Sequence, residues 1–263
     1  YVLKGKSAWL ATAFCSFILL IAFVIPIAVL INYAITYFDK AWNVEFFSYA
    51  WQSLKVAGVV SLITITLSIF VVFYQRVAKQ TYPLVPGRLA STGYALPGTV
   101  LAIAVLLPLT LLENTINTAL EPYNLDIGLL LTGSILTIII AYIVRFYAIA
   151  HGAIESSFLR ISPSLDMASQ SMGKSQGQTL RLVHLPLLRR GLLTAALLVF
   201  IECMKELPAA LLLRPFNFES LATHVFQYVS DEQLELASIS ALFIVIVGFI
   251  PLYFINRSME QRS

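Results

Sequence analysis

Residues 8–33 read AWLATAFCSFILLIAFVIPIAVLINY and contain no charged side chain. A membrane-spanning helix needs about 20 predominantly apolar residues to cross roughly 30 Å of hydrocarbon. This run is long enough, and it lacks the apolar–polar alternation of the strands in a membrane barrel. It is also too long for the apolar core of a signal peptide and has no small-residue cleavage site. Residues 8–33 therefore predict a first transmembrane helix.

Five further apolar runs follow, at residues 54–74, 89–112, 127–147, 191–213 and 236–255. Of the 263 residues, 59% are hydrophobic and only 12% are charged, about half of the charged fraction in soluble domains. So few charges could not cover a soluble surface, and a net charge of +3 is too small for a broad polyanion-binding face. The sequence predicts an all-α, polytopic membrane bundle of about six helices. Its surroundings are lipid, and soluble enzymes, disordered chains and nucleic-acid binders are excluded.

The basic residues predict the orientation of the bundle. With the N-terminus inside, 13 of the 17 lysines and arginines fall on the cytoplasmic side. Only Lys40, Lys55 and Arg214 lie on the outer side, and Lys205 falls within a span. Because basic residues concentrate in cytoplasmic loops, we expect both termini in the cytoplasm. The longest cytoplasmic segment is then residues 148–190.

Residues 162–188 of that segment read SPSLDMASQSMGKSQGQTLRLVHLPLL. Pro163 suits the first turn of a helix, where its missing N–H would be unpaired in any case. Gly173 interrupts the pattern, and a second short helix is expected from residue 175 to about 184, ended by Leu185 and Pro186. Two short helices joined at a glycine would form a protruding knob that suits docking into a groove of a soluble partner.

This segment resembles the EAA loop of ABC-importer permeases, the membrane subunits of binding-protein-dependent importers. That motif reads Glu-Ala-Ala, three residues, Gly, nine residues, then Ile-x-Leu-Pro. The matching positions are Met167, Ala168, Ser169, Gly173, Val183, Leu185 and Pro186. Met167 departs from the family glutamate, and Asp166 beside it is a candidate to take over part of the acidic role. The resemblance implies that residues 160–190 couple the permease to an ATPase subunit.

The chain itself is expected to bind no cofactor. Residues 173–175 read GKS, like the end of a phosphate-binding P-loop, but that pattern needs a glycine where Ala168 stands and a preceding strand. Cys15 and Cys203 lie in apolar runs, and the three histidines are far apart, so no disulfide, metal site or catalytic group is predicted. The resemblance places ATP on the partner subunit.

The fifth apolar run, residues 191–213, reads GLLTAALLVFIECMKELPAALLL and contains Glu202, Lys205 and Glu206 near its middle. A charge at the centre of a membrane helix costs about 2.5–3.5 kcal/mol. Spacing of four places both glutamates on one face, and Lys205 can neutralise Glu202. Pro208 removes a backbone hydrogen bond and should kink the helix. Two interpretations stay open: a polar lining of a translocation path or gate, or an ion-pair network that fixes helix packing or lies near the outer interface.

A second resemblance concerns the substrate. Residues 204–222 (MKELPAALLLRPFNFESLA) and 225–242 (VFQYVSDEQLELASISAL) are similar to ferric-iron permeases. Residues 95–107 (ALPGTVLAIAVLL) fit them too, but this pattern is shared with thiamine, phosphonate and molybdate permeases, which remain alternatives.

Iron-type permeases often fuse two six-helix halves in one polypeptide. The resemblance therefore implies that residues 1–263, which begin with Tyr1 rather than Met, are one permease domain and one such half, the C-terminal one. The implied partners are a second permease half, two ABC ATPase subunits and a periplasmic iron-binding protein, in the bacterial inner membrane.

Two other classes of membrane protein are the alternatives. An ion-gradient-driven secondary transporter could use Glu202, Lys205 and Glu206 to relay protons. A membrane-embedded enzyme would need a reactive set of side chains, which the sequence does not offer. The EAA-type spacing favours a transport subunit without catalytic residues.

Overall fold

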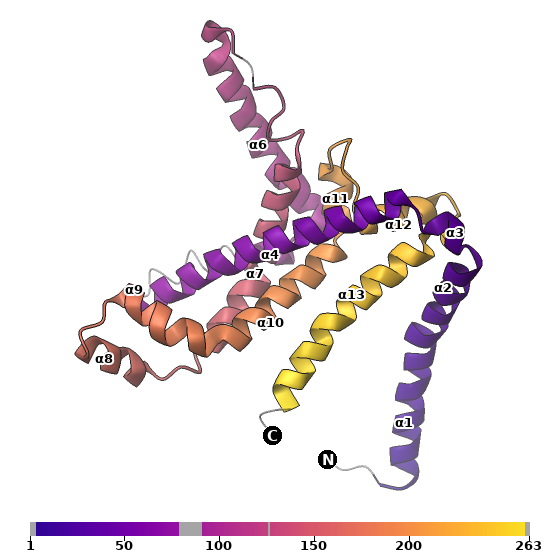
Figure 1. The fold of residues 1–263 in the computed structure, drawn as a ribbon, viewed down its shortest axis with the longest axis horizontal. Coiled ribbons are helices and arrows are strands. Elements are labelled where there is room, and N and C mark those ends of the chain that lie inside the picture. Colours follow the sequence, from indigo (N-terminus) through magenta and orange to yellow (C-terminus); the bar gives the residue numbers. More distant parts are fainter. Residues whose placement is uncertain (1–3, 79–90, 126, 261–263) are drawn as a thin grey trace.

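The chain is built of helices joined by short connections in the computed structural model, which describes residues 4–78, 91–125 and 127–260 (Figure 1). None of these described ranges contains a strand, so the predicted all-α class is confirmed. In chain order the elements are α1 (Lys6–Leu19), η1 (Leu20–Val24), α2 (Ile25–Thr36), α3 (Phe38–Ala41), α4 (Val44–Ala78), η2 (Ser91–Ala95), α6 (Gly98–Leu120), η3 (Glu121–Tyr123), α7 (Ile135–Phe158), α8 (Pro163–Ser171), α9 (Gln176–Thr179), η4 (Leu180–His184), α10 (Leu185–Met204), α11 (Pro208–Leu213), α12 (Leu221–Ser230) and α13 (Leu234–Glu260).

Within the described ranges, four helical segments are long and apolar enough to cross a membrane: Lys6–Thr36, Val44–Ala78, Gly98–Tyr123 and Ile135–Phe158. The first two contain the predicted spans 8–33 and 54–74. The third predicted span begins at residues 89–90, outside the described part of the chain, and its remainder lies mostly in α6. The sixth lies within α13, whose apolar part is Leu234–Ile250.

The prediction that the fourth span begins at residue 127 is wrong, because α7 begins at Ile135. The residues before it turn back onto α6. There the buried carboxylate of Glu113 accepts the Leu131 N–H at 2.7 Å and the Thr132 hydroxyl. Ser134 then caps α7, as serine commonly does at a helix N-terminus. Apolar composition alone could not show that a glutamate on the preceding helix holds this turn.

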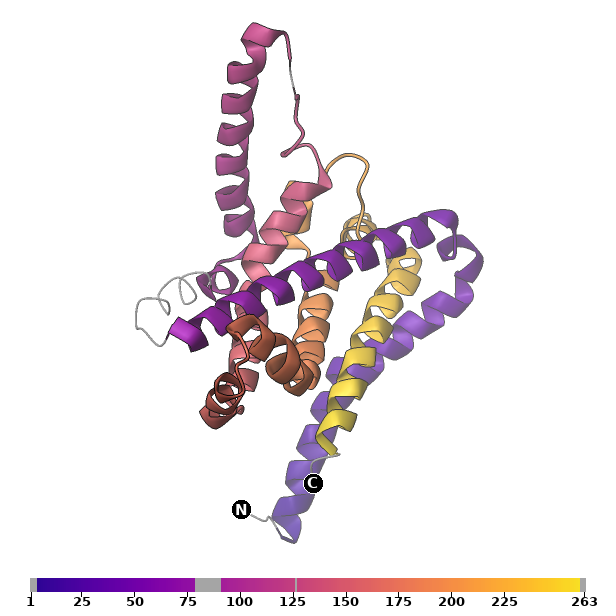
Figure 2. The ribbon, with the colours of Figure 1, turned by 60° about the vertical axis from the view of Figure 1, so that its left-hand side comes forward.

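The core of the bundle is formed by α4, α7 and α10, which pack against one another (Figure 2). Small side chains allow close approach, as is usual between membrane helices. The hydroxyl of Ser61 on α4 donates to the carbonyl of Ala196 on α10 at 2.8 Å, and Gly191 on α10 lies directly against Ser157 on α7. Helix α13 packs against α2 and α12, and α6 projects away from this core in both views (Figures 1 and 2).

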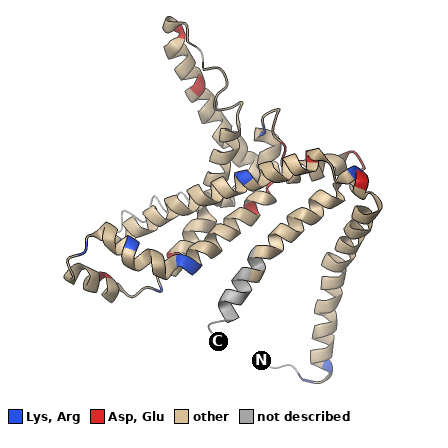
Figure 3. Cartoon of the chain, in the orientation of Figure 1, with Lys and Arg blue, Asp and Glu red and all other residues tan. Residues whose placement is uncertain are grey.

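Charged side chains are sparse along the helices and gather mainly near their ends and around α8 and α9 (Figure 3). The arm formed by α1 and α2 has none between Lys6 and Asp39. Trp9 and Ile35 on this arm are 79% and 74% exposed. Such a surface suits lipid rather than water, because large exposed apolar patches are rare on soluble proteins.

Two prolines follow wide, π-helical turns instead of ending their helices. The N–H of Ile25, before Pro26, bonds to the carbonyl of Leu20, and the N–H of Leu185, before Pro186, bonds to that of Leu180. The wider turn shifts the carbonyl that the proline ring would otherwise strike. The prediction that Leu185 and Pro186 end the second loop helix is therefore wrong: the helix continues into α10.

The fifth predicted span is divided into two helices, so the expected kink is a complete interruption. Helix α10 ends at Met204 and α11 begins at Pro208. Pro208 has no N–H for the carbonyl of Met204, which favours a break there. The Glu206 side chain accepts the Ala209 N–H at 3.3 Å and so satisfies one of the free amides that begin α11.

Candidate functional site

The knob, residues 162–184, has the predicted form of two short helices joined at Gly173. Ser162 caps α8, and Ser175 forms a capping box with Gln178 at the start of α9. Gly173 has a φ of 73°, a left-handed conformation that glycine adopts without the penalty of a side chain. The N–H of Lys174 bonds to the carbonyl of Ser169 at 3.1 Å, which closes the turn. Local hydrogen bonds therefore define the shape of the knob.

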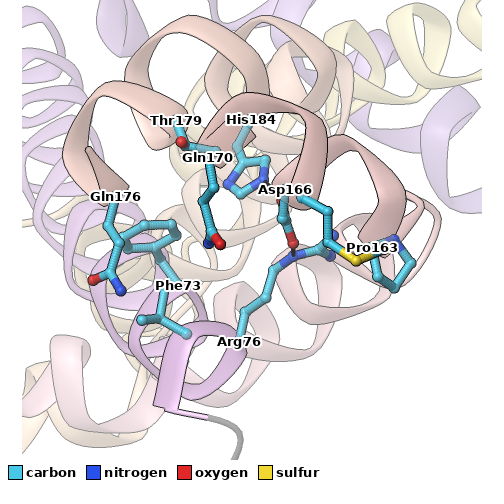
Figure 4. A pocket seen from close by; sticks show the side chains of 10 residues that line it. Phe73, Arg76, Pro163, Asp166, Gln170, Gln176, Thr179 and His184 are labelled. Carbon is cyan, nitrogen blue, oxygen red and sulfur yellow. Dashed lines mark hydrogen bonds and ion pairs between the residues drawn. The ribbon is translucent and has the colours of Figure 1, made fainter. Parts of the chain in front are cut away.

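Asp166 is the polar centre of the knob and faces the bundle (Figure 4). One carboxylate oxygen lies 2.7 Å from Nε of Arg76, in the last turn of α4, and the other lies 2.6 Å from Nε2 of His184. The guanidinium of Arg76 also donates to the carbonyls of Phe158 and Ile161, both at 2.9 Å. We call Arg76, Asp166 and His184 the anchor cluster.

The environment of Asp166 keeps its carboxylate charged. Burial raises its pKa, but the hydrogen bonds from Arg76 and His184 and the positive charge of Arg76 outweigh burial, so the pKa lies below the usual value. Asp166 is therefore ionised at neutral pH. A cavity of about 320 Å³ lies beside the cluster, between α4 and the knob, with Phe73, Val77, Met167 and Gln170 in its wall.

The motif positions fall into exposed and buried groups. Met167, where the family has glutamate, is 59% exposed. Ser169 is buried and its hydroxyl bonds to that of Thr179 at 2.8 Å, which joins α8 to α9. Ala168 and Pro186 are exposed, and Val183 and Leu185 are half-buried. Asp166 is bound to Arg76 and His184 and so does not replace the family glutamate on the surface of the knob. The exposed residue at the glutamate position is the apolar Met167.

A second polar group lies where α10 is interrupted. Lys205 pairs with Glu202 at 2.7 Å, as their spacing predicted. The expectation that Glu206 shares a helical face with Glu202 is wrong, because the helix ends at Met204 before Glu206 is reached. Glu206 instead pairs with Arg145 of α7 at 3.0 Å.

The pair of Arg145 and Glu206 is buried at the junction of three helices. Only 8% of the Glu206 side chain and 16% of the Arg145 side chain are exposed. Arg145 also donates to the carbonyl of Leu96 at 2.9 Å, and Tyr142 donates to the Glu206 carbonyl at 3.2 Å. A Cβ on Gly98, at the start of α6, would lie 2.8 Å from the Glu206 carboxylate, so this position has room only for glycine.

Arg145 was missed as a site residue because the sequence placed it among the cytoplasmic basic residues. The usable signal was that Arg145 lies within the predicted span 127–147, where a charge normally requires a partner. No group of three or more His, Cys, Asp or Glu side chains that could hold a metal occurs in the described ranges. The interrupted helix offers two ion pairs, Arg145 with Glu206 and Lys205 with Glu202.

The resemblance of the knob to the EAA loop predicts that replacing Gly173 by proline removes docking to an ATPase subunit without preventing membrane insertion. Proline cannot adopt the positive φ of this residue, and it would remove the hydrogen bond from the Gly173 N–H to the Gln170 carbonyl at 2.9 Å. The measurement is co-purification of an ATPase subunit with the membrane-inserted variant.

The matched control is Gly177→Ala, because a Cβ at Gly177 meets no atom within 4 Å. This control should retain the ATPase subunit. Normal co-purification with Gly173→Pro would contradict the docking role of the knob.

The fold and the two polar groups define a class: a polytopic membrane protein with an interrupted helix in its bundle and a protruding helical knob. The family model described as "Binding-protein-dependent transport system inner membrane component" matches residues 85–263, which include the knob and the interrupted helix but not Arg76. The chain belongs to this family of transport subunits.

Curated relatives are ferric-iron permeases. The chain is 27% identical over 256 residues to the "Fe(3+)-transport system permease protein FbpB 2" of Haemophilus influenzae, covering 96% of this chain and 47% of the relative. It is 32% identical over 122 residues to the "Ferric transport system permease protein FbpB" of Actinobacillus pleuropneumoniae, covering 46% of this chain and 18% of the relative. The chain therefore spans at most about half the length of these relatives.

Solved structures share the fold. A chain of a bacterial ABC transporter involved in the import of the acidic polysaccharide alginate matches with a TM-score of 0.72 and 16% identity, over 97% of this chain and 96% of that one. A chain of the MetNI methionine ABC transporter in inward-facing form matches with a TM-score of 0.60 and 16% identity, over 83% and 96%. At this identity the likeness concerns the fold alone.

Proposed function

We propose that this chain forms half of the membrane pathway of an ATP-driven importer of ferric iron. The observation that carries the proposal is the similarity to the Haemophilus Fe(3+)-transport permease along 96% of the chain. In this proposal a second permease half completes the pathway and a periplasmic binding protein delivers the iron. The protein lies in the bacterial inner membrane with both termini in the cytoplasm, as the distribution of basic residues favours.

The knob is proposed as the contact with the ATPase, within a coupling loop at residues 160–190. One knob from each permease half would engage one of two ATPase subunits, and all ATP would be bound there. ATP binding would close the two subunits and move the knobs, the helices would rock, and the pathway would open toward the loaded binding protein. An exposed, hydrogen-bonded knob supports this role because a coupling element must act as one body on a two-state equilibrium.

The interrupted helix is proposed to line the pathway or its gate. Non-helical backbone at membrane depth is tolerated where it is buried in protein or lines a water-filled cavity. Glu206 is buried at this interruption, and Pro208, which begins α11, is exposed. The side chains of Lys205 and Glu202 are 55% and 25% exposed. The more exposed pair is the one we expect to face the moving ion.

Replacing Lys205 by methionine should impair iron uptake more than assembly. Exposed ion pairs contribute at most about 1 kcal/mol to stability, so the variant should assemble normally. Uptake per assembled transporter should fall by about tenfold, which corresponds to roughly 1.4 kcal/mol in the barrier. Lys40→Met, an exposed change distant from the interruption, is the control, and uptake equal to that control would support a packing role alone.

The proposed function is tested by purifying the full transporter from its native membrane in mild detergent. An ATPase subunit should co-purify, and an iron-loaded periplasmic fraction should stimulate its activity more than the same fraction stripped of iron. Stimulation by thiamine, phosphonate or molybdate in place of iron would contradict the assignment of ferric iron as the substrate. Absence of an ATPase subunit would contradict the assignment to ATP-driven importers.

A further inference from the structure

We infer that the anchor cluster of Arg76, Asp166 and His184 is the joint through which movement of the knob reaches the core helices. This inference rests on the proposed coupling function and names the positioning residues for it. The three side chains come from α4, α8 and the π turn that begins α10, and Arg76 also binds the end of α7. The cluster thus joins the knob to each of the three core helices.

Arg76 provides the connection to α4 and α7. Its guanidinium uses three separate N–H groups: Nε for Asp166, and the two terminal nitrogens for the carbonyls of Phe158 and Ile161. Carbonyls at the end of a helix lack intrahelical partners. The Phe158 carbonyl accepts the Ile161 N–H at 3.0 Å as well as Arg76, and Arg76 also supplies a donor to the Ile161 carbonyl beyond the helix end. A planar guanidinium holds such partners in a fixed geometry, which a lysine ammonium cannot reproduce.

His184 provides the connection to α10. It is 1% exposed and packs between the rings of Phe73 and Phe158, with centroids at 5.7 and 5.4 Å. Its Nε2 lies 2.6 Å from Asp166. Because the ring is enclosed, a displacement of Asp166 is passed to the start of α10 rather than absorbed by rotation of the imidazole.

The contact between α8 and the core depends on this polar cluster more than on apolar packing. Ser169 is the buried residue of α8, and its partner Thr179 belongs to the knob itself. Beside the cluster, Met167 and Gln170 of α8 and Phe73 and Val77 of α4 line the cavity of about 320 Å³, and Figure 4 shows Gln170 and Phe73 in its wall. Loss of the Asp166 charge should therefore leave the knob folded but loosely connected.

The test uses the full transporter with its ATPase subunits and iron-loaded binding protein. Asp166→Asn removes the charge, and Arg76→Lys keeps the charge but loses the three-way geometry. The control is Asp231→Asn, which makes the same change of charge at an exposed residue that follows the end of α12. Three quantities are measured per assembled transporter: ATPase subunit retained, stimulation of ATP hydrolysis by the loaded binding protein, and iron imported per ATP.

We expect both cluster variants to retain the ATPase subunit while stimulation falls by about tenfold, a typical size of coupling between sites. Iron imported per ATP should fall with it, and Asp231→Asn should behave as the unmodified protein. Normal stimulation per assembled transporter in both variants would overturn the inference. So would loss of the ATPase subunit with normal activity in the complexes that remain, because the cluster would then serve docking alone.

Failure of the proposed function is recognised separately, since the unmodified transporter would then lack iron-stimulated ATP hydrolysis. The joint itself is still tested by a spin label on Met172→Cys, a position that is 70% exposed at the end of α8, with both native cysteines replaced. The label should become more mobile in Asp166→Asn than in Asp231→Asn. Equal mobility would overturn the inference whatever the protein transports.

Discussion

Replacing Glu206 by glutamine is expected to destabilise the bundle by about 3–5 kcal/mol, the cost of leaving one partner of a buried ion pair without the other. The change preserves shape and can still accept the Ala209 N–H, so the loss isolates the pairing with Arg145 at 3.0 Å. Thermal unfolding in detergent is followed with a thiol-reactive dye, which labels a buried cysteine only when the protein unfolds. The reporter is Cys203, which is buried, in a Cys15→Ser background because Cys15 is exposed.

Glu202→Gln is the matched control. Its ion pair with Lys205 is far more exposed and should contribute at most about 1 kcal/mol. The double variant Arg145→Met with Glu206→Gln should recover much of the stability, because no unpaired charge then remains. If Glu206→Gln were as stable as Glu202→Gln, the buried pair would not hold α7 to the interrupted helix.

Replacing Gly191 by alanine is the second change with a large expected effect. A Cβ there would lie 2.8 Å from the Cβ of Ser157 and would overlap its hydroxyl oxygen. Helices α7 and α10 would have to separate, and overpacking of this kind costs about 1–3 kcal/mol. The same Cys203 dye assay measures the loss.

Gly152→Ala on α7 is the control, because a Cβ at Gly152 meets no atom within 4 Å. That change should be neutral or stabilise by about 0.4–1 kcal/mol, since alanine loses less backbone entropy than glycine. Adding Ser157→Gly to Gly191→Ala should restore stability by removing the opposing atoms. Equal stability of Gly191→Ala and Gly152→Ala would contradict the close packing of α7 on α10.

The sequence predicted the helices whose formation the lipid environment requires. An uncharged run such as residues 8–33 must be helical in a bilayer, because every backbone polar group needs an internal partner there. Local contacts were also predictable: Lys205 pairs with Glu202, and Gly173 joins two short helices, because each depends on neighbours only a few residues apart.

Contacts between distant segments could not be predicted in the same way. Glu206 pairs with Arg145, and Asp166 pairs with Arg76. Helical spacing predicts only contacts between residues three or four positions apart, so it could not predict these pairs. The interruption after Met204 followed from Pro208, but its extent depends on the carboxylate that caps the next helix. Similarly, Pro186 resembled a helix end because the π turn before it has no clear signature in a single sequence.

The most direct test of the proposed function is uptake of radioactive iron by vesicles containing the purified full transporter. We predict that iron accumulates only with ATP on the cytoplasmic side and iron-loaded binding protein on the other, whether or not an ion gradient is imposed. Accumulation driven by an ion gradient without ATP would contradict the proposal and indicate a secondary transporter. ATP-driven uptake of a different solute with no uptake of iron would contradict the assignment of substrate.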